Sequence, residues 1–275
     1  MNKVNTKSQA VRILIFGHKE FSQLMTSVLP EFGGQAKFKL FDAIVGSVSE
    51  IDEHINNFLP DVIVSAGSNA AYLRSALDLP VVSLDCSVTD IISALQRAAQ
   101  VSRKIVMINF AEASPVVPVL EAALNVTVQE EIYTTAEQAR ELFQLTRQQP
   151  NIAFVGASLV CGLATQHGIP SFLLYSADSC RQTISTAIQI ANEQLVTNQG
   201  VALTNWLLKQ SKTPIFMTDE DGQSIIFNQA ARRDLGVDNG NCSDLESLIH
   251  SEEITRPTDG ECRIQGIDWW FHQDC

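Results

Sequence analysis

The sequence predicts an α/β protein made of two parallel-sheet lobes, followed by a long connecting helix and a small α+β domain. Two observations predict the lobes: short apolar strands alternate with helical segments between residues 12 and 175, and this series occurs twice. A third observation, a hairpin signal that follows a long helical segment, predicts the separate last domain. With 275 residues the chain is long enough for these parts.

The repeat is clearest in two segments that lie 90 residues apart. Residues 60–68, PDVIVSAGS, align without gaps with residues 150–158, PNIAFVGAS. The same offset superposes three further pairs: Leu73 and Leu163, Pro80 and Pro170, Leu84 and Leu174. Each copy has the pattern of strand, turn of small residues, helix, proline and strand. We therefore expect two Rossmann-like lobes in the arrangement of a periplasmic binding protein.

Four strands are expected in each lobe. The first lobe, residues 1–86, has apolar runs near 12–17, 36–45, 61–65 and 80–84. The second lobe, residues 87–176, has them near 104–110, 126–133, 152–156 and 171–175. The intervening segments have helical apolar spacing, as in residues 88–102, where the apolar positions are Ile91, Ile92, Leu95 and Ala98. Parallel sheets are covered by helices on their faces, which this order of elements provides.

The predicted fold places a ligand between the lobes. Ligands of such sheets bind beyond the carboxyl ends of the strands, and interfaces between domains favour pockets. The turn 65–69 of the first lobe and its counterpart 155–158 would form opposite walls of this cleft. The candidate ligand-binding residues in the turns and at the helix starts are His18, Lys19, Gly67, Ser68, Asn69, Ser87, Asp90, Ala157, Ser158 and Arg181.

These residue types suit a small anion. Backbone N–H groups at a helix start attract negative charge, and Gly67 would let a ligand approach the backbone closely. Ser68 and Asn69 add short hydrogen-bonding side chains, and we also expect at least one of them to cap the following helix. Lys19 and Arg181 are possible cations, since the planar fork of arginine suits a carboxylate, or they are solvated helix residues. Ser87 and Asp90 are possible caps of the helix after residue 87.

Signatures of catalysis are missing from the sequence. Residues 156–160, GASLV, lack the final glycine of a nucleophile elbow, and the chain has no P-loop, GxGxxG or HExxH motif. We therefore expect no catalytic residue, metal or cofactor. An alternative is a lyase or isomerase of small acids, for which His18 and Asp90 are the one acid–base pair that the sequence offers. A solute-binding protein is a third alternative, but the N-terminus lacks the apolar core of a signal peptide.

Composition indicates which classes of partner and which cellular compartment to expect. The chain has 19 basic and 31 acidic residues and a net charge of −12, which repels nucleic acid, so direct nucleic-acid contact is not expected. No run approaches the roughly 18 apolar residues of a membrane span. The six cysteines form no CxxC pair, which is typical of reduced thiols. These features predict a cytoplasmic protein.

Residues 177–212 are predicted to form a connecting helix that can pack back on the first lobe. Its apolar residues, among them Ile184, Ile188, Leu195 and Trp206, form a stripe too wide for a lone solvated helix, so we expect a homodimer. Gly200 is expected to interrupt this helix.

Residues 213–275 contain the signal of a further domain. The segment 214–236, PIFMTDEDGQSIIFNQAARRDLG, has two β-rich runs joined by Asp221-Gly222, and then a short helix. With Asp219, the run 228–231 (NQAA) and Leu235-Gly236, it resembles the opening of a PAS domain, although the segment is shorter than such domains usually are.

The order of these parts resembles the N-terminal sensory region of sigma-54-dependent activators of propionate catabolism. The residues that carry the resemblance are 66–73 (AGSNxAYL, with position 70 open), Ser87 with Asp90, 155–157 (VGA), 175–177 (YSA) and Arg181-Gln182. It implies a carboxylate effector, 2-methylcitrate, whose binding acts on an ATPase domain and a DNA-binding domain and, through them, on sigma-54 RNA polymerase. This chain would then be a fragment of a longer regulator. It departs from the family pattern at Val88-Thr89 and at Ser158.

Overall fold

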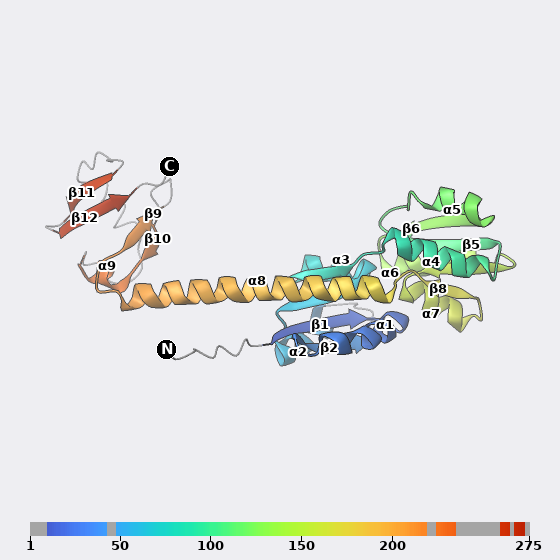
Figure 1. Ribbon diagram of the computed structural model, residues 1–275, viewed down its shortest axis with the longest axis horizontal. Helices are drawn as coiled ribbons and strands as arrows, with labels where there is room; N and C mark the ends of the chain where they lie inside the picture. Colours follow the sequence, from blue (N-terminus) through green and yellow to red (C-terminus); the bar gives the residue numbers. More distant parts are fainter. Residues whose placement is uncertain (1–9, 43–47, 219–223, 235–258, 265–266, 273–275) are drawn as a thin grey trace. The chain divides into compact units, whose positions relative to one another are not determined.

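The computed structural model describes residues 10–42, 48–218, 224–234, 259–264 and 267–272 (Figure 1). The chain divides into two compact units, residues 1–195 and 196–275, which are described separately below.

The first unit contains two four-stranded parallel sheets with the same strand order. One sheet has the order β2-β1-β3-β4 and the other the order β6-β5-β7-β8. The strands of the first are β1 (Val11–Gly17), β2 (Ala36–Asp42), β3 (Val62–Ala66) and β4 (Val81–Leu84). Those of the second are β5 (Lys104–Phe110), β6 (Thr127–Tyr133), β7 (Ile152–Gly156) and β8 (Ser171–Leu173). The predicted α/β fold with two like lobes is confirmed.

Helices connect the strands and cover both faces of each sheet. They are α1 (Glu20–Val28), the 3-10 turn η1 (Leu29–Phe32), α2 (Val48–Phe58), α3 (Gly67–Ala76), α4 (Val88–Ala99), α5 (Val117–Leu124), α6 (Ala136–Thr146), α7 (Ser158–Gln166) and α8 (Ala177–Gln210). Successive side chains of β1 show why two layers are needed. Ile13 and Ile15 belong to one buried cluster, and Leu14 and Phe16 to another, because neighbouring side chains of a strand point to opposite faces.

The chain crosses between the lobes twice. Helix α4 follows β4 of the first lobe, but Ile91 and Leu95 pack in the core of the second lobe with Ile105 and Val155. Helix α8 follows β8 of the second lobe, but its first half returns to the first lobe. There Ile184, Ala187, Ile188 and Ala191 are buried against strands β1, β3 and β4. The segments between β4 and α4 and between β8 and α8 are therefore the two crossovers between the lobes.

Helix α8 runs without a break through Gly200, so the interruption expected there is wrong. Glycine lowers helix propensity by about 1 kcal/mol relative to alanine, but it keeps the N–H donor that proline would remove. Among the described residues, no helix is both long and apolar enough to cross a bilayer.

The second unit holds the second half of α8, strands β9 (Phe216–Thr218) and β10 (Ser224–Phe227), helix α9 (Gln229–Asp234), and strands β11 (Asp259–Ile264) and β12 (Ile267–His272). Strand β9 pairs with β10, and β11 with β12, both antiparallel. Buried Asn228 joins the residue before β9 to helix α9: its Oδ1 accepts hydrogen bonds from the N–H groups of Ile215 and Ala231, at 2.9 Å each. The Asp221-Gly222 turn, Asp219 and Leu235-Gly236 lie outside the described residues, so the PAS domain stays a prediction.

Candidate functional site

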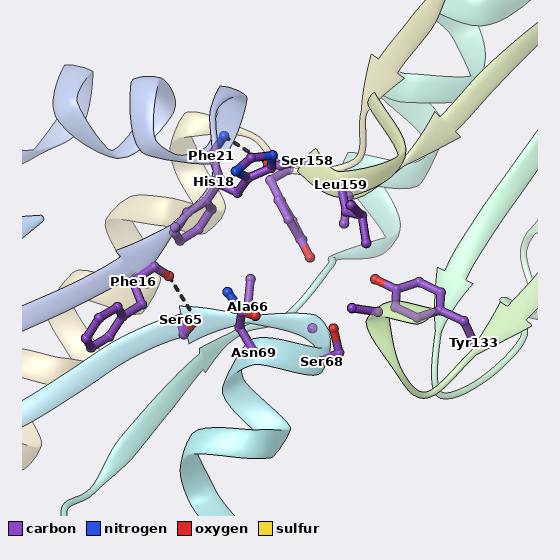
Figure 2. A pocket seen from close by; sticks show the side chains of 15 residues that line it. Phe16, His18, Phe21, Ser65, Ala66, Ser68, Asn69, Tyr133, Ser158 and Leu159 are labelled. Carbon is purple, nitrogen blue, oxygen red and sulfur yellow. Dashed lines mark hydrogen bonds between the residues drawn. The ribbon is translucent and has the colours of Figure 1, made fainter. Parts of the chain in front are cut away.

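Two cavities lie between the lobes, at the carboxyl ends of the strands. The smaller, with a volume of about 50 Å³, is lined by residues 16–18, 65–69, 133 and 157–159, among others (Figure 2). The larger, of about 410 Å³, is lined mainly by residues 83–86 and 108–115 and by one face of α3. Both cavities have Gly67, Tyr133, Ala157 and Tyr175 in their walls.

The strand order explains this position. Strands β1 and β3 are neighbours in the first sheet, although the chain forms β2 between them, and β5 and β7 are related in the same way in the second. The connections after such strands leave on opposite sides of the sheet, and the crevice between them is where α/β proteins bind ligands. Residues that follow β1, β3, β5 and β7 line the cavities, so the two crevices face each other.

Gly67 lets the two lobes approach closely. It begins α3 with φ +53°, a conformation that only glycine adopts without cost. A Cβ atom added at Gly67 would lie 3.3 Å from the hydroxyl oxygen of Tyr133 and 3.9 Å from Cγ of Phe110, both in the second lobe. A larger residue at this position would therefore press against the opposite wall of the cleft.

Tyr133 supplies a hydrogen-bond donor to this wall. It ends β6 and is buried, and burial raises the pKa of its hydroxyl to about 12. The hydroxyl is thus protonated at neutral pH. Figure 2 shows it directed towards the turn that carries Ser68.

Two helix starts without side-chain caps line the smaller cavity. Helix α3 has Ala66 at its N-cap position and α7 has Ala157, and neither helix has a side-chain capping bond. The expectation that Ser68 or Asn69 caps α3 is therefore wrong. Because the left-handed Gly67 already begins the helix, Ser68 and Asn69 stand in its first turn, where they line the cavity. Such helix starts present N–H groups to an anion.

Ser158 ties the lobes together. Its side chain is buried, and its Oγ accepts a hydrogen bond from the backbone N–H of Phe21 at 3.0 Å (Figure 2). Phe21 lies in the first turn of α1, in the first lobe, whereas Ser158 begins α7 in the second. The candidate residue on the second wall is thus already engaged in a contact between the lobes.

Replacing Ser158 with alanine should lower the free energy of unfolding by about 1 kcal/mol, because the N–H of Phe21 loses its partner in a buried place. Chemical denaturation measures this. The control is Ser75→Ala, which removes an exposed hydroxyl that bonds only within α3, to the carbonyl of Tyr72. An equal loss in both variants would show that the contact between the lobes adds nothing.

His18 lines the smaller cavity, whereas Lys19 lines neither. Burial lowers the pKa of His18, although its Nδ1 lies 3.5 Å from a carboxylate oxygen of Asp42, so the ring is neutral at neutral pH. The backbone N–H of Lys19 donates to Asp42 at 2.7 Å, and its side chain lies beside Gly162 of α7. The lysine therefore does not supply the expected cation to these cavity walls.

Ser87 and Asp90 form a hydrogen-bonded group at the crossovers. Ser87 is the N-cap of α4, and Asp90 accepts bonds from its N–H at 2.9 Å and its hydroxyl at 2.7 Å. Buried Asp90 also accepts a bond from the hydroxyl of Ser179 at the start of α8. Burial alone would raise the pKa of Asp90, but the hydrogen bonds from Ser176, Ser179 and Ser87 outweigh it and lower this pKa.

Asp90 therefore joins the two crossovers and lines neither cavity. The structure does not bring it together with His18 on a cavity wall. Arg181 also lies outside both cavities. Its guanidinium donates to Glu31, with Nε 2.9 Å from Oε2 and Nη2 3.0 Å from Oε1, and to Asp178 at 2.6 Å. The expected cleft arginine is instead held by two carboxylates at the surface.

The larger cavity has a cation that the sequence reasoning missed. Arg74 is the one arginine or lysine among the residues that line the two cavities, and Asp85 and Glu112 are acidic residues of the same wall. Its Nε donates to the carbonyl of Val81 at 3.1 Å, which fixes the side chain at the rim. The helical spacing of Gly67, Ala71 and Arg74, all on the cavity wall, was the available signal.

Comparison with known proteins agrees with the two-lobed fold. A family model described as propionate catabolism activator matches residues 36–195. The crystal structure of an NtrC family transcriptional regulator from Clostridium acetobutylicum is similar, with a TM-score of 0.58 and 18% identity, over 68% of this chain and 100% of that one. The transcription regulator CcpA of Lactococcus lactis matches more weakly, with a TM-score of 0.38 and 12% identity over 69% of this chain and 92% of that one.

Proposed function

The chain belongs to the propionate catabolism activator family, and from this we propose that its first unit binds a small carboxylate metabolite between the lobes. In this family the unit is a sensory regulatory region of an activator. The observation that carries the proposal is the pair of helix starts, one from each lobe, that line one cavity without a side-chain cap. An anion held there would contact both lobes at once.

The size and the donors of the site support this ligand class. The larger cavity, about 410 Å³, falls within the roughly 300–1,000 Å³ of small-molecule sites. A ligand in it would meet the hydroxyl of Tyr133 and the terminal nitrogens of Arg74, which suit a carboxylate. It would reach the helix starts through Gly67 and Ala157, which line both cavities.

The signal would pass through α8. Binding shifts a conformational equilibrium only if the ligand binds one arrangement of the lobes better than another, and a ligand that contacts both lobes does so. Helix α8 begins at the second crossover and continues to Gln210. We propose that it relays closure towards ATPase and DNA-binding domains beyond this chain, and so to sigma-54 RNA polymerase.

Calorimetric titration with 2-methylcitrate, citrate, propionate and lactate tests the proposal. At least one acid should bind, and Arg74→Met should weaken it tenfold or more, because a bidentate partner of the carboxylate is lost. The matched control is Arg103→Met, since Arg103 also donates to backbone carbonyls, those of Leu124 and Asn125, but lines neither cavity. Absence of heat with every acid would contradict the proposal.

The lyase or isomerase alternative has no observation of its own in its favour. It needs His18 and Asp90 as an acid–base pair. His18 lines the smaller cavity, whereas Asp90 accepts hydrogen bonds from Ser87 and Ser179 at the crossovers.

A further inference from the structure

The wall of the larger cavity carries more negative than positive charge. Among the described residues that line it, Arg74 is the one basic side chain, and Asp85 and Glu112 are acidic. The described lining of the smaller cavity adds no charge, because burial lowers the pKa of His18 and keeps that ring neutral. A ligand with three carboxylates would therefore meet one cation and two anions, and like charges repel. The wall instead suits a ligand that has one anionic and one cationic group.

The two acidic side chains come from different lobes. Asp85 directly follows β4 of the first lobe, and Glu112 lies two residues after the end of β5 in the second. In the described part of the chain, neither side chain forms an ion pair or accepts a hydrogen bond. Two like charges on opposite sides of a cleft oppose its closure, and a cation between them removes this repulsion. A cationic group of the ligand would therefore be attracted by both lobes.

A buried hydroxyl indicates where the anionic group of the ligand binds. The side chain of Tyr133 is 2% exposed and lines both cavities, and its hydroxyl is directed towards the turn that carries Ser68 (Figure 2). This hydroxyl forms no hydrogen bond with another described residue. Buried polar groups are normally hydrogen-bonded, so an unpaired donor on a cavity wall indicates an acceptor on the ligand. A carboxylate there would also lie beside Gly67, at the start of α3.

Much of the remaining wall of the larger cavity is apolar. The large apolar side chains that line it are Leu84, Val88, Ile91, Ile108, Phe110 and Leu174. Apolar ligand surface that is buried against such side chains favours binding, whereas a carboxylate that is buried without a cation opposes it. The part of the ligand between and beyond its charged groups should therefore be hydrocarbon.

We propose that the effector is an amino acid with an apolar side chain. This inference rests on the proposed binding of a carboxylate between the lobes, and it names the class of that carboxylate. The carboxylate of the amino acid bonds to Tyr133 and Arg74 near the helix starts, and its ammonium group lies between Asp85 and Glu112. Its side chain packs on the apolar wall. Because the ammonium group is attracted by a carboxylate of each lobe, the amino acid favours the closed arrangement of the lobes.

Titration calorimetry of the whole chain with matched ligands tests this assignment. Propionate, lactate and alanine differ only in the group on the second carbon, which is hydrogen, hydroxyl or ammonium. Alanine should bind at least tenfold more tightly than propionate and lactate, and valine more tightly than alanine. Propionate and lactate, which offer the carboxylate without the ammonium group, should displace valine at higher concentrations.

The outcomes separate this inference from the proposed function. If citrate or 2-methylcitrate binds more tightly than both amino acids, or if alanine binds no more tightly than propionate, the amino-acid assignment is overturned and the carboxylate site stands. If none of these compounds binds, both are overturned.

A variant tests the place of the ammonium group. Glu112→Gln should lower the affinity for valine at least tenfold more than the affinity for propionate, because the amide leaves the ammonium group without a charged partner. The matched control is Glu141→Gln, since Glu141 is an exposed glutamate of α6 that lines neither cavity, and it should leave both affinities unchanged. Equal losses for the two ligands in Glu112→Gln would overturn the place given to the ammonium group.

Discussion

Gly67→Ala should reduce effector affinity at least tenfold and lower the free energy of unfolding by about 1–2 kcal/mol. The stability loss follows from the left-handed backbone at φ +53°, which costs an L residue about that much. The affinity loss follows from the new methyl group, 3.3 Å from the Tyr133 hydroxyl, which displaces the wall of the opposite lobe. Calorimetry and chemical denaturation measure the two effects.

The chain offers a matched control for this variant. Gly168 has φ +67°, but a Cβ atom added there would meet nothing within 4 Å. Gly168→Ala should therefore show the backbone cost alone, with effector affinity unchanged. If the two variants lose the same stability and both keep full affinity, the close approach of the lobes at Gly67 has no part in binding.

Asp90→Ala should lower the free energy of unfolding by about 3 kcal/mol at neutral pH. The substitution leaves the donors of Ser87 and Ser179 without their charged partner, and hydrogen bonds to a charged group contribute about 1.5–3 kcal/mol each. The control is Asp61→Ala, since Asp61 accepts a bond from the N–H of Arg12 at 2.7 Å, away from the crossovers. A loss no greater than that of the control would contradict the central position given to Asp90.

The contribution of Asp90 should depend on pH with a definite sign. Its pKa in the folded protein is lowered, so the folded state binds the proton less readily than the unfolded state. The stabilisation is therefore fully present above the ordinary aspartate pKa, about 3.9, and is lost as the pH falls through the lower folded value. The difference in stability between wild type and Asp90→Asn should shrink below about pH 4. A difference that stays constant from pH 7 to pH 3 would contradict this.

Most of the first unit could be predicted from the sequence, because its parallel strands are apolar runs bounded by turns. The strands expected near 61–65 and 152–156, for example, are β3 and β7, and the 90-residue repeat corresponds to two sheets of one topology. The position of the turns 65–69 and 155–158 on the cavity walls could also be predicted. In α/β sheets, ligand sites form beyond the carboxyl ends of the strands, where the strand order reverses.

Contacts between distant segments could not be predicted. Arg181 pairs with Glu31, 150 residues away, and no local pattern indicates that pairing. The start of α3 could not be placed from the sequence, because Gly67 adopts φ +53° and begins the helix one residue before Ser68. The place of Arg74 on the cavity wall could have been predicted, since it shares a helical face with Gly67 and Ala71.

Hydrogen–deuterium exchange of the whole chain tests binding between the lobes most directly. With the acid that binds most tightly in the titration, we expect slower exchange in two segments at once, residues 65–72 of the first lobe and 155–160 of the second. These segments contain the two helix starts that line one cavity. Slower exchange in one lobe only, or only beyond residue 213, would contradict binding between the lobes.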